Sequence, residues 1–130
     1  MSTIKANTLL HSDGSTTNPP AIPALDIRMA KAWVVFAGNA AGTESGTVAI
    51  KRSYNTSSVT DNAAGDYTLN WTTALPSDIY CESVQVSDSG SYTIARGYGH
   101  RTASLRDIKT FTPAGALGDA AHVSYIAFDE

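Results

Sequence analysis

The sequence has a single cysteine, Cys81, among its 130 residues. One cysteine cannot form a disulfide within the chain, and it cannot supply the cysteine pairs of the usual structural zinc sites. We expect Cys81 to be a small buried apolar residue, because free cysteine is among the most buried residue types. The cysteine content therefore predicts neither a metal site nor a disulfide framework.

Basic charge is also scarce, and long apolar runs are missing. Nine Lys and Arg residues stand against twelve Asp and Glu residues, which gives a net charge of −3. Because nucleic-acid binding needs clustered Lys and Arg over a whole face, no nucleic-acid partner is expected. The sequence has neither a basic leader followed by an apolar run nor a stretch of about 18 apolar residues. We expect synthesis in the cytoplasm and no membrane insertion.

A helical period over three turns is missing too, and short strand-like runs take its place. In the clearest run Tyr67, Leu69 and Trp71 alternate with polar residues, so they share one face. Turn signals separate the runs, with a hairpin connection at Asp61–Asp66 and a loop at Gly97–His100. About eight short strands are typical of a sandwich or a closed barrel, and we expect an all-β, antiparallel β-sandwich over residues 31–130. The expected strands are Trp33–Phe36, Thr47–Lys51, Ser57–Thr60, Tyr67–Thr72, Tyr80–Val86, Tyr92–Ala95, Ser104–Phe111 and His122–Phe128.

We expect residues 1–30 to form an extended N-terminal arm. Pro19, Pro20 and Pro23 prevent a helix and favour polyproline-like backbone, which has no internal hydrogen bonds. Such an arm needs an external surface, on its own domain, a neighbouring subunit or a larger assembly; a disordered tail is the alternative. A helical turn is expected at Asp26–Lys31, with Asp26 as its N-cap. The apolar anchors of the arm are Ile4, Leu9, Leu10, Ile22 and Leu25.

Several segments resemble one kind of protein. The runs Ala30–Phe36, Gly46–Asn62 and Gly65–Thr68 resemble a domain found in tail-fibre and other virion structural proteins of bacteriophages. Ile4–Leu9 and Asp13–Ser15 are similar to the short N-terminal stretch that often begins such proteins, including those of marine and cyanobacterial phages. The resemblance covers the arm and the first half of the chain. The second half shares only a general β-rich character.

The resemblance implies a non-enzymatic subunit of a phage particle that assembles as a homotrimer. It implies attachment to other tail or capsid proteins through the N-terminal arm, with the outer end free for the host or the environment. Such domains usually end a much longer chain, whereas this sequence has almost nothing before the domain. We therefore expect a short fibre, a knob or a capsid decoration in the virion. A host-receptor tip that binds surface glycan is the alternative function.

Basic and aromatic residues gather in one stretch of the second half. They predict either a patch that meets an acidic partner, such as lipopolysaccharide phosphates or a carboxylated capsid surface, or a rim that is intersubunit or solvated. Tyr98, between two glycines, is the best candidate for an exposed aromatic that stacks on a sugar, with packing at a trimer axis as the alternative. The stretch contains Arg96, His100, Arg101, Arg106 and Lys109, opposed by Asp107. The expected partner or glycan contacts are Arg96, Tyr98, His100 and Arg101.

No motif predicts catalysis or metal binding. His11, His100 and His122 are far apart in the sequence, and the expected hairpin loop lacks the spacing and the glutamate of a calcium loop. A glycosidase needs two carboxylates across a cleft, which Asp78 and Glu82 would form only by chance. A single domain of this size is stable without a cofactor. We therefore expect no catalytic residues, no metal, no cofactor and no enzyme.

Overall fold

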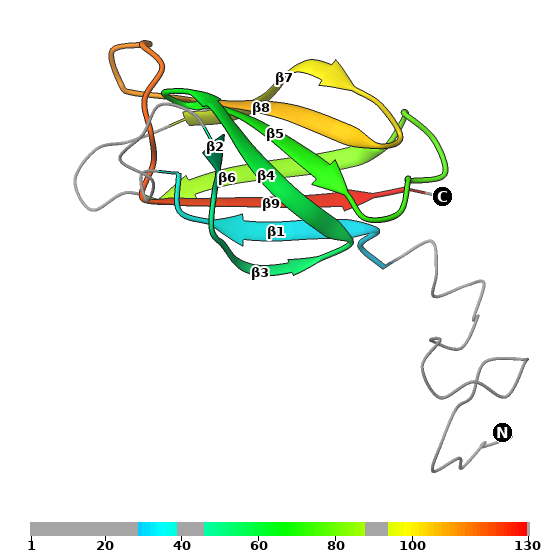
Figure 1. Cartoon of the computed structure of the whole chain (residues 1–130). Coiled ribbons are helices and arrows are strands. Elements are labelled where there is room, and N and C mark those ends of the chain that lie inside the picture. Colours follow the sequence, from blue (N-terminus) through cyan, green and yellow to red (C-terminus); the bar gives the residue numbers. More distant parts are fainter. Residues whose placement is uncertain (1–28, 39–45, 88–93, 130) are drawn as a thin grey trace, which may run out of the picture.

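The chain forms two antiparallel β-sheets packed face to face (Figure 1). A computed structural model describes residues 29–38, 46–87 and 94–129, and these contain nine strands and no helix. One sheet has four strands in the order β3-β1-β9-β6, and the other has five in the order β2-β4-β5-β8-β7. The predicted all-β sandwich is confirmed. The strands are β1 (Ala32–Phe36), β2 (Gly46–Thr47), β3 (Ile50–Tyr54), β4 (Thr56–Ala63), β5 (Asp66–Trp71), β6 (Cys81–Ser87), β7 (Ile94–Arg101), β8 (Leu105–Phe111) and β9 (His122–Phe128).

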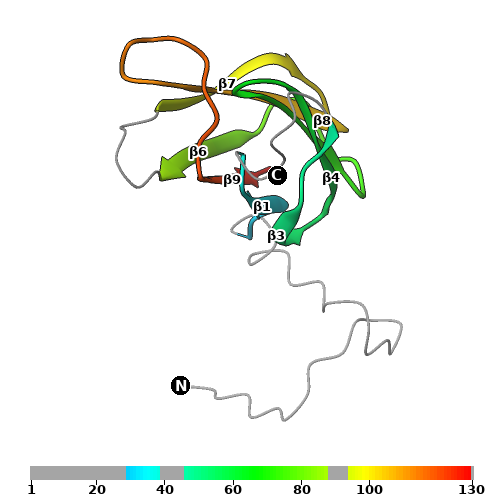
Figure 2. The same cartoon turned by 60° about the vertical axis from the view of Figure 1, so that its left-hand side comes forward.

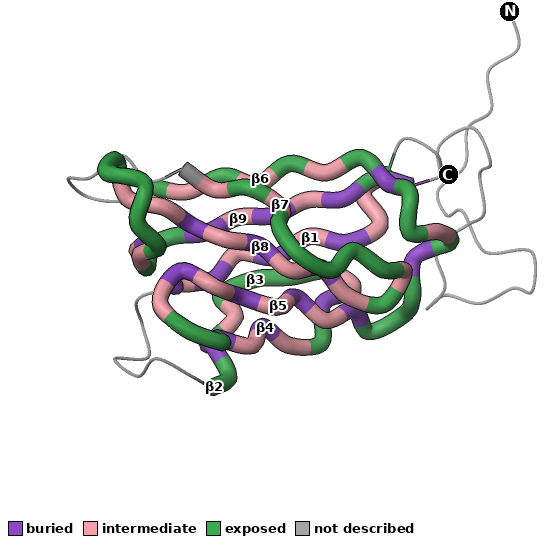
Figure 3. Tube along the Cα trace, turned by 90° about the horizontal axis from the view of Figure 1, so that it is seen from above, coloured by how far each residue is buried: buried purple, intermediate pink, exposed green. Residues whose placement is uncertain are grey.

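The two sheets lie face to face (Figure 2). The core between them is filled by alternate side chains of the strands. Tyr67, Leu69 and Trp71 of β5 are buried, while the polar residues between them are half-buried, as the alternation predicted. The same alternation runs along β8 and β9 (Figure 3). Phe36 of β1 meets Tyr67 edge to face across the sheets, with ring centroids 5.2 Å apart. Apolar burial of this kind is the main stabilising contribution to a fold of this size.

The predicted strand Thr47–Lys51 is wrong, because this run contributes to two strands in different sheets. β2 ends at Thr47 in the five-stranded sheet, and β3 begins at Ile50 in the four-stranded sheet. Val48 lies between them and is only 3 % exposed, and its N–H donates to the Val59 carbonyl at 2.9 Å. One apolar run thus changes sheet without leaving the core, and a period-two pattern does not reveal the change.

Asn55 makes the next crossing between the sheets, from β3 to β4. Its φ is 54°, a left-handed conformation that Asn adopts more readily than most residues. Its side-chain amide donates to the carbonyls of Lys31 at 3.0 Å and Thr73 at 2.9 Å. Its side-chain oxygen accepts the Thr73 N–H at 2.8 Å. This corner therefore joins the start of β1 to the segment that follows β5.

The expected loop Gly97–His100 is also wrong. These residues belong to β7, which pairs with β8 through a register shift between Gly97 and Arg101. Gly99 adopts a φ of 79° within this irregular stretch, so the glycines serve a distorted strand rather than a loop. Tyr92 and Thr93, the first residues of the strand expected before this loop, lie outside the described residues.

Two further expectations concern Cys81 and the N-terminal region. Cys81 is exposed, because it begins the edge strand β6 and faces outward, so its expected burial is wrong. Met29–Lys31 are not helical, and the rest of the expected helical turn lies outside the described residues. The arm residues Ile4, Leu9, Leu10, Ile22 and Leu25 also lie outside them, so their predicted role stays a prediction.

A buried ion pair joins the two sheets beneath β7. Arg106 of β8 donates from Nε to Oε2 of Glu82 in β6 at 2.7 Å, and from Nη2 to the other carboxylate oxygen. The Tyr125 hydroxyl donates to the same carboxylate at 2.7 Å. A Cβ atom on Gly97 would lie 1.7 Å from Arg106 Nη2. The glycine therefore leaves the room in which the two charges meet.

The ion pair makes the fold sensitive to acid. Burial raises the pKa of Glu82, but the hydrogen bonds from Arg106 and Tyr125 outweigh it, and the pKa lies below its ordinary value. A carboxyl group with a lowered folded-state pKa stabilises the fold above its unfolded pKa, which is about 4.3 for Glu. This stabilisation is lost as the pH falls through the lower, folded value.

Removing one partner of this ion pair should lower the free energy of unfolding far more than removing both. We expect Glu82→Leu to lower the free energy of unfolding by about 3–5 kcal/mol, because it leaves the Arg106 guanidinium buried and uncompensated. The double variant Glu82→Leu with Arg106→Met should recover most of this loss. Urea unfolding at neutral pH measures both values.

The Asp66–Lys109 pair, which lies within the five-stranded sheet, supplies the control, since it is more exposed, with Nζ and Oδ2 3.1 Å apart. Asp66→Leu should cost about 1 kcal/mol or less. Equal losses for Glu82→Leu and the double variant would contradict the interpretation.

Candidate functional site

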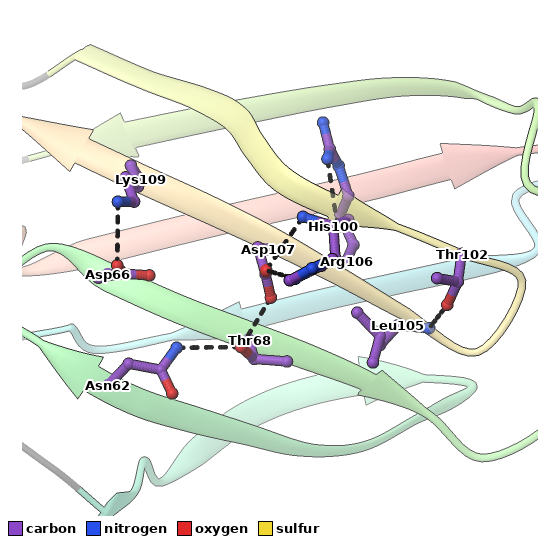
Figure 4. A network of polar contacts seen from close by, with 9 residues as sticks. All are labelled: Asn62, Asp66, Thr68, His100, Thr102, Leu105, Arg106, Asp107 and Lys109. Atoms are coloured by element: carbon purple, nitrogen blue, oxygen red, sulfur yellow. Dashed lines mark hydrogen bonds and ion pairs between the residues drawn. The ribbon is translucent and has the colours of Figure 1, made fainter.

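The outer face of the five-stranded sheet carries a connected set of polar side chains (Figure 4). Because the inward residues of β5 and β8 are buried, the residues between them point away from the core. We call this surface the polar face, and we define it by Asn62 of β4, Asp66 and Thr68 of β5, Arg96, Tyr98 and His100 of β7, and Asp107, Lys109 and Phe111 of β8.

Hydrogen bonds run across the polar face from β4 to β7. The Asn62 amide donates to the Thr68 hydroxyl at 3.0 Å, and that hydroxyl donates to Asp107 Oδ1 at 2.7 Å. The second carboxylate oxygen accepts the His100 N–H at 3.1 Å and lies 3.0 Å from His100 Nδ1. Asp107 is therefore the centre of the chain of contacts. The His100 side chain is 85 % exposed and is the most accessible member.

Two cations of the polar face lie over aromatic rings. Lys109 Nζ is 4.4 Å from the centroid of the Tyr98 ring and 3.1 Å from Asp66 Oδ2. The Arg96 guanidinium carbon is 4.4 Å from the centroid of the Phe111 ring. Tyr98 is still 51 % exposed. The face therefore presents an accessible ring beside charged and hydrogen-bonding groups, the combination that suits a sugar or another polar ligand.

The structure divides the basic residues that the sequence places in one stretch. Arg96, Tyr98 and His100 lie on the polar face, whereas the Arg101 guanidinium lies 5.3 Å from the centroid of the Tyr80 ring. Arg106 is 7 % exposed and belongs to the buried ion pair. A continuous basic patch that includes Arg106 is therefore wrong. Alternation along β8 explains it, since Arg106 and its neighbours face opposite sides of the sheet.

Sequence reasoning missed the partners that hold these residues. Thr68 was placed on the outer side of its strand by the alternation around Tyr67, but nothing local paired it with Asp107. The pairing comes from the register of β5 and β8, in which Thr68 lies opposite Asp107 and Asp66 opposite Lys109. Register between strands this far apart in the chain is a property of the folded sheet.

The pKa of Asp107 follows from the same contacts. Burial raises it, but hydrogen bonds from the Thr68 hydroxyl and from the His100 backbone and ring outweigh this effect, so the pKa lies below its ordinary value. Asp107 therefore stabilises the folded state above its unfolded pKa, and this contribution is lost as the pH falls through the lower folded value.

The outer face of the four-stranded sheet is different and carries a strip of apolar side chains. The inward residues of β1 and β9 belong to the core, so Trp33, Val35 and Ile126 point away from it. Trp33 lies between Ile126 of β9 and Tyr54 of β3 in the strand register, and Tyr54 is 54 % exposed. We call this surface the apolar face, and we define it by Trp33, Val35, Tyr54, Ile126 and Phe128.

A shallow pocket of about 270 Å³ lies on the apolar face. Trp33 and Ile126 give it an apolar wall, and the outward residues of β6 give it a polar margin. Its lining residues are Trp33, Ser83, Gln85, Ser124, Tyr125 and Ile126. An aromatic side chain beside amide and hydroxyl groups is suited to a ligand that has both apolar surface and free carbonyl groups.

The ionic groups near both faces are engaged in structural contacts. Glu82, Asp107 and Asp66 are bound respectively by Arg106, by Thr68 with His100, and by Lys109. Among the described residues, no three His, Cys, Asp or Glu side chains lie together in a way that could hold a metal ion.

Comparison with protein families, curated proteins and solved structures finds no match in any of the three. No helix among the described residues has the length and apolar character needed to cross a membrane.

The hydrogen bond from Thr68 should contribute measurably to the acidity of Asp107. We expect Thr68→Val to raise the pKa of Asp107 toward its ordinary value, because the variant keeps the shape of the side chain and removes the donor. NMR titration of the Asp107 carboxyl carbon measures this shift. Thr60→Val, directly opposite Thr68 in the register of β4 and β5, is the matched control and should leave the pKa unchanged. An unaltered Asp107 titration in Thr68→Val would refute the assigned cause.

Proposed function

We propose that the chain is a non-enzymatic structural subunit of a bacteriophage particle, a short fibre, knob or capsid decoration. It assembles as a homotrimer and attaches to other tail or capsid proteins through its N-terminal arm. The supporting sequence segments are those that resemble virion proteins. They form β1, β2, β3, most of β4 and the start of β5, and so contribute strands to both sheets.

The observation that carries the proposal is the apolar face. Among the described residues, no element lies over the outer side of the four-stranded sheet, although Trp33 lies opposite Ile126 there and Val35 follows Trp33 on the same side of β1. Antiparallel sheets that face water on one side normally carry polar residues on that side. A contiguous apolar patch indicates an interaction surface, since burial stabilises an assembly by about 25 cal/mol per Å².

Charge on the apolar face should dissociate the assembly. We expect the unaltered chain to give about three times the 13.7 kDa monomer mass in light scattering at micromolar concentration. Val35→Lys should yield monomers, because an unpaired buried ammonium costs several kcal/mol and weakens association by about 100-fold or more.

Thr60→Lys, which places the same charge on the outer side of the other sheet, is the control and should remain trimeric. A monomeric unaltered chain would overturn the proposed assembly. Trimers that persist in Val35→Lys would show that another surface holds the subunits together.

The polar face supports a second function, the recognition of host surface glycan. The specific observation is Tyr98, which is half-exposed and stands beside Lys109 and the His100–Asp107 contact. Tyrosine offers a flat apolar surface for a sugar ring and a polar tip, and neighbouring donors and acceptors can bind sugar hydroxyls. This function is compatible with assembly, since the two faces lie on opposite sides of the sandwich.

Removing the ring of Tyr98 should weaken glycan binding. Stacking on an aromatic ring contributes about 0.5–1.5 kcal/mol, so Tyr98→Ala should reduce binding about 3- to 10-fold on a glycan array or on host cells. Ile79→Ala removes an exposed apolar side chain that belongs to neither face and should bind glycan normally. Absence of binding by the unaltered chain, or equal binding by Tyr98→Ala, would eliminate this candidate.

A further inference from the structure

We propose that the pocket beside Trp33 receives the proline-rich segment Asn18–Pro23 of a neighbouring copy of the chain. This inference rests on the proposed assembly and specifies what covers the apolar face. The segment docks in an extended polyproline conformation, so that each subunit binds the arm of the next.

The chemistry of the pocket fits a polyproline segment. Polyproline backbone makes no internal hydrogen bonds, so its carbonyl groups remain free to accept them, and its rings are apolar. Recognition of such segments uses aromatic side chains for the rings and nearby donors for the carbonyls. The pocket offers Trp33 with its register neighbour Tyr54 for the first task. The Gln85 amide and the Ser83 hydroxyl are suited to the second.

The sequence of the arm supplies a matching ligand. Pro19, Pro20 and Pro23 favour the extended conformation before binding, so less conformational entropy is lost on docking. Ile22, within the same segment, adds an apolar side chain. The segment carries no charged residue. It therefore enters an apolar pocket without the desolvation of a charge.

The direction in which the chain enters β1 favours a neighbouring copy over the same copy. The Lys31 N–H still donates to the Ala127 carbonyl at 2.8 Å, so the backbone follows β9 up to that residue. Trp33 lies two residues further into the strand. If the arm is extended as its prolines predict, it would continue away from its own pocket, and at about 3.1 Å per residue the proline segment would lie roughly 25 Å beyond Lys31. Return to the same pocket requires the chain to reverse within residues 24–28.

Arms that bind the next subunit create a head-to-tail interface. Such interfaces close into rings when the rotation between subunits allows it. A ring of three copies is the assembly proposed above. In it every pocket holds the proline segment of a neighbouring copy, and residues 1–17 of each arm remain for attachment to other tail or capsid proteins. The inference thus accounts for the apolar face and the proline segment by one contact.

The single exposed cysteine allows the contact to be tested in the full chain. Cys81 lies on the outward side of β6, two residues from Ser83 in the pocket lining. In Ile22→Cys, a short bismaleimide reagent should join residue 22 to Cys81 of another copy. Denaturing gels should then show covalent dimers and trimers, and mass spectrometry should identify the linked peptides. Ser15→Cys, in the polar part of the same arm, is the matched control and should link poorly.

Each outcome separates this inference from the proposed assembly. Trimers in light scattering without links between residues 22 and 81 would overturn the inference and leave the assembly standing. Links within one copy would overturn exchange between copies. A monomeric chain would overturn both.

A second variant tests the pocket rather than the arm. Gln85 is exposed on β6, so Gln85→Ala should leave the fold intact. Loss of one hydrogen bond of about 1 kcal/mol should slow linking of Ile22→Cys about fivefold. An unchanged rate would count against this pocket as the docking site.

Discussion

The packing of the two inner sheet faces against each other is the constraint on which the other features depend. Tyr67, Leu69 and Phe36 fill the interior, and their exclusion of water decides which way every neighbouring residue points. The ion pair of Glu82 and Arg106 lies between the same two sheets. It is tolerated there because the guanidinium binds the carboxylate through two hydrogen bonds and Tyr125 supplies a third.

The two outer faces differ in how their side chains are satisfied. On the polar face, side chains bind one another, so Asp107 and Lys109 have partners within the monomer. On the apolar face, Trp33 and Ile126 are adjacent and can gain further burial only from another surface. This asymmetry is why assembly is assigned to one face and ligand recognition to the other. A sandwich can serve both functions because its two outer faces do not compete for the same residues.

The extent to which the candidate site could be predicted differs between its members. The flanking glycines predict that Tyr98 is an exposed aromatic, and the residue is 51 % exposed. The glycines had a different role, however. Gly97 leaves space for the Arg106–Glu82 pair, a purpose that becomes visible only when β6 and β8 are brought together. From the sequence, Arg106 is one member of a basic surface cluster, because a run of basic residues does not show which side chains point toward the core.

The sequence alone determined the fold class and the inward side of the clearest strand. Alternation around Tyr67, Leu69 and Trp71 is a local property, and burial of one side follows directly from it. Only the tertiary structure decided where one run changes sheet at Val48, that Cys81 faces outward, and that Thr68 meets Asp107. These features depend on strand register and on which edges remain unpaired. Both arise from contacts between residues distant in the chain, so local periodicity does not encode them.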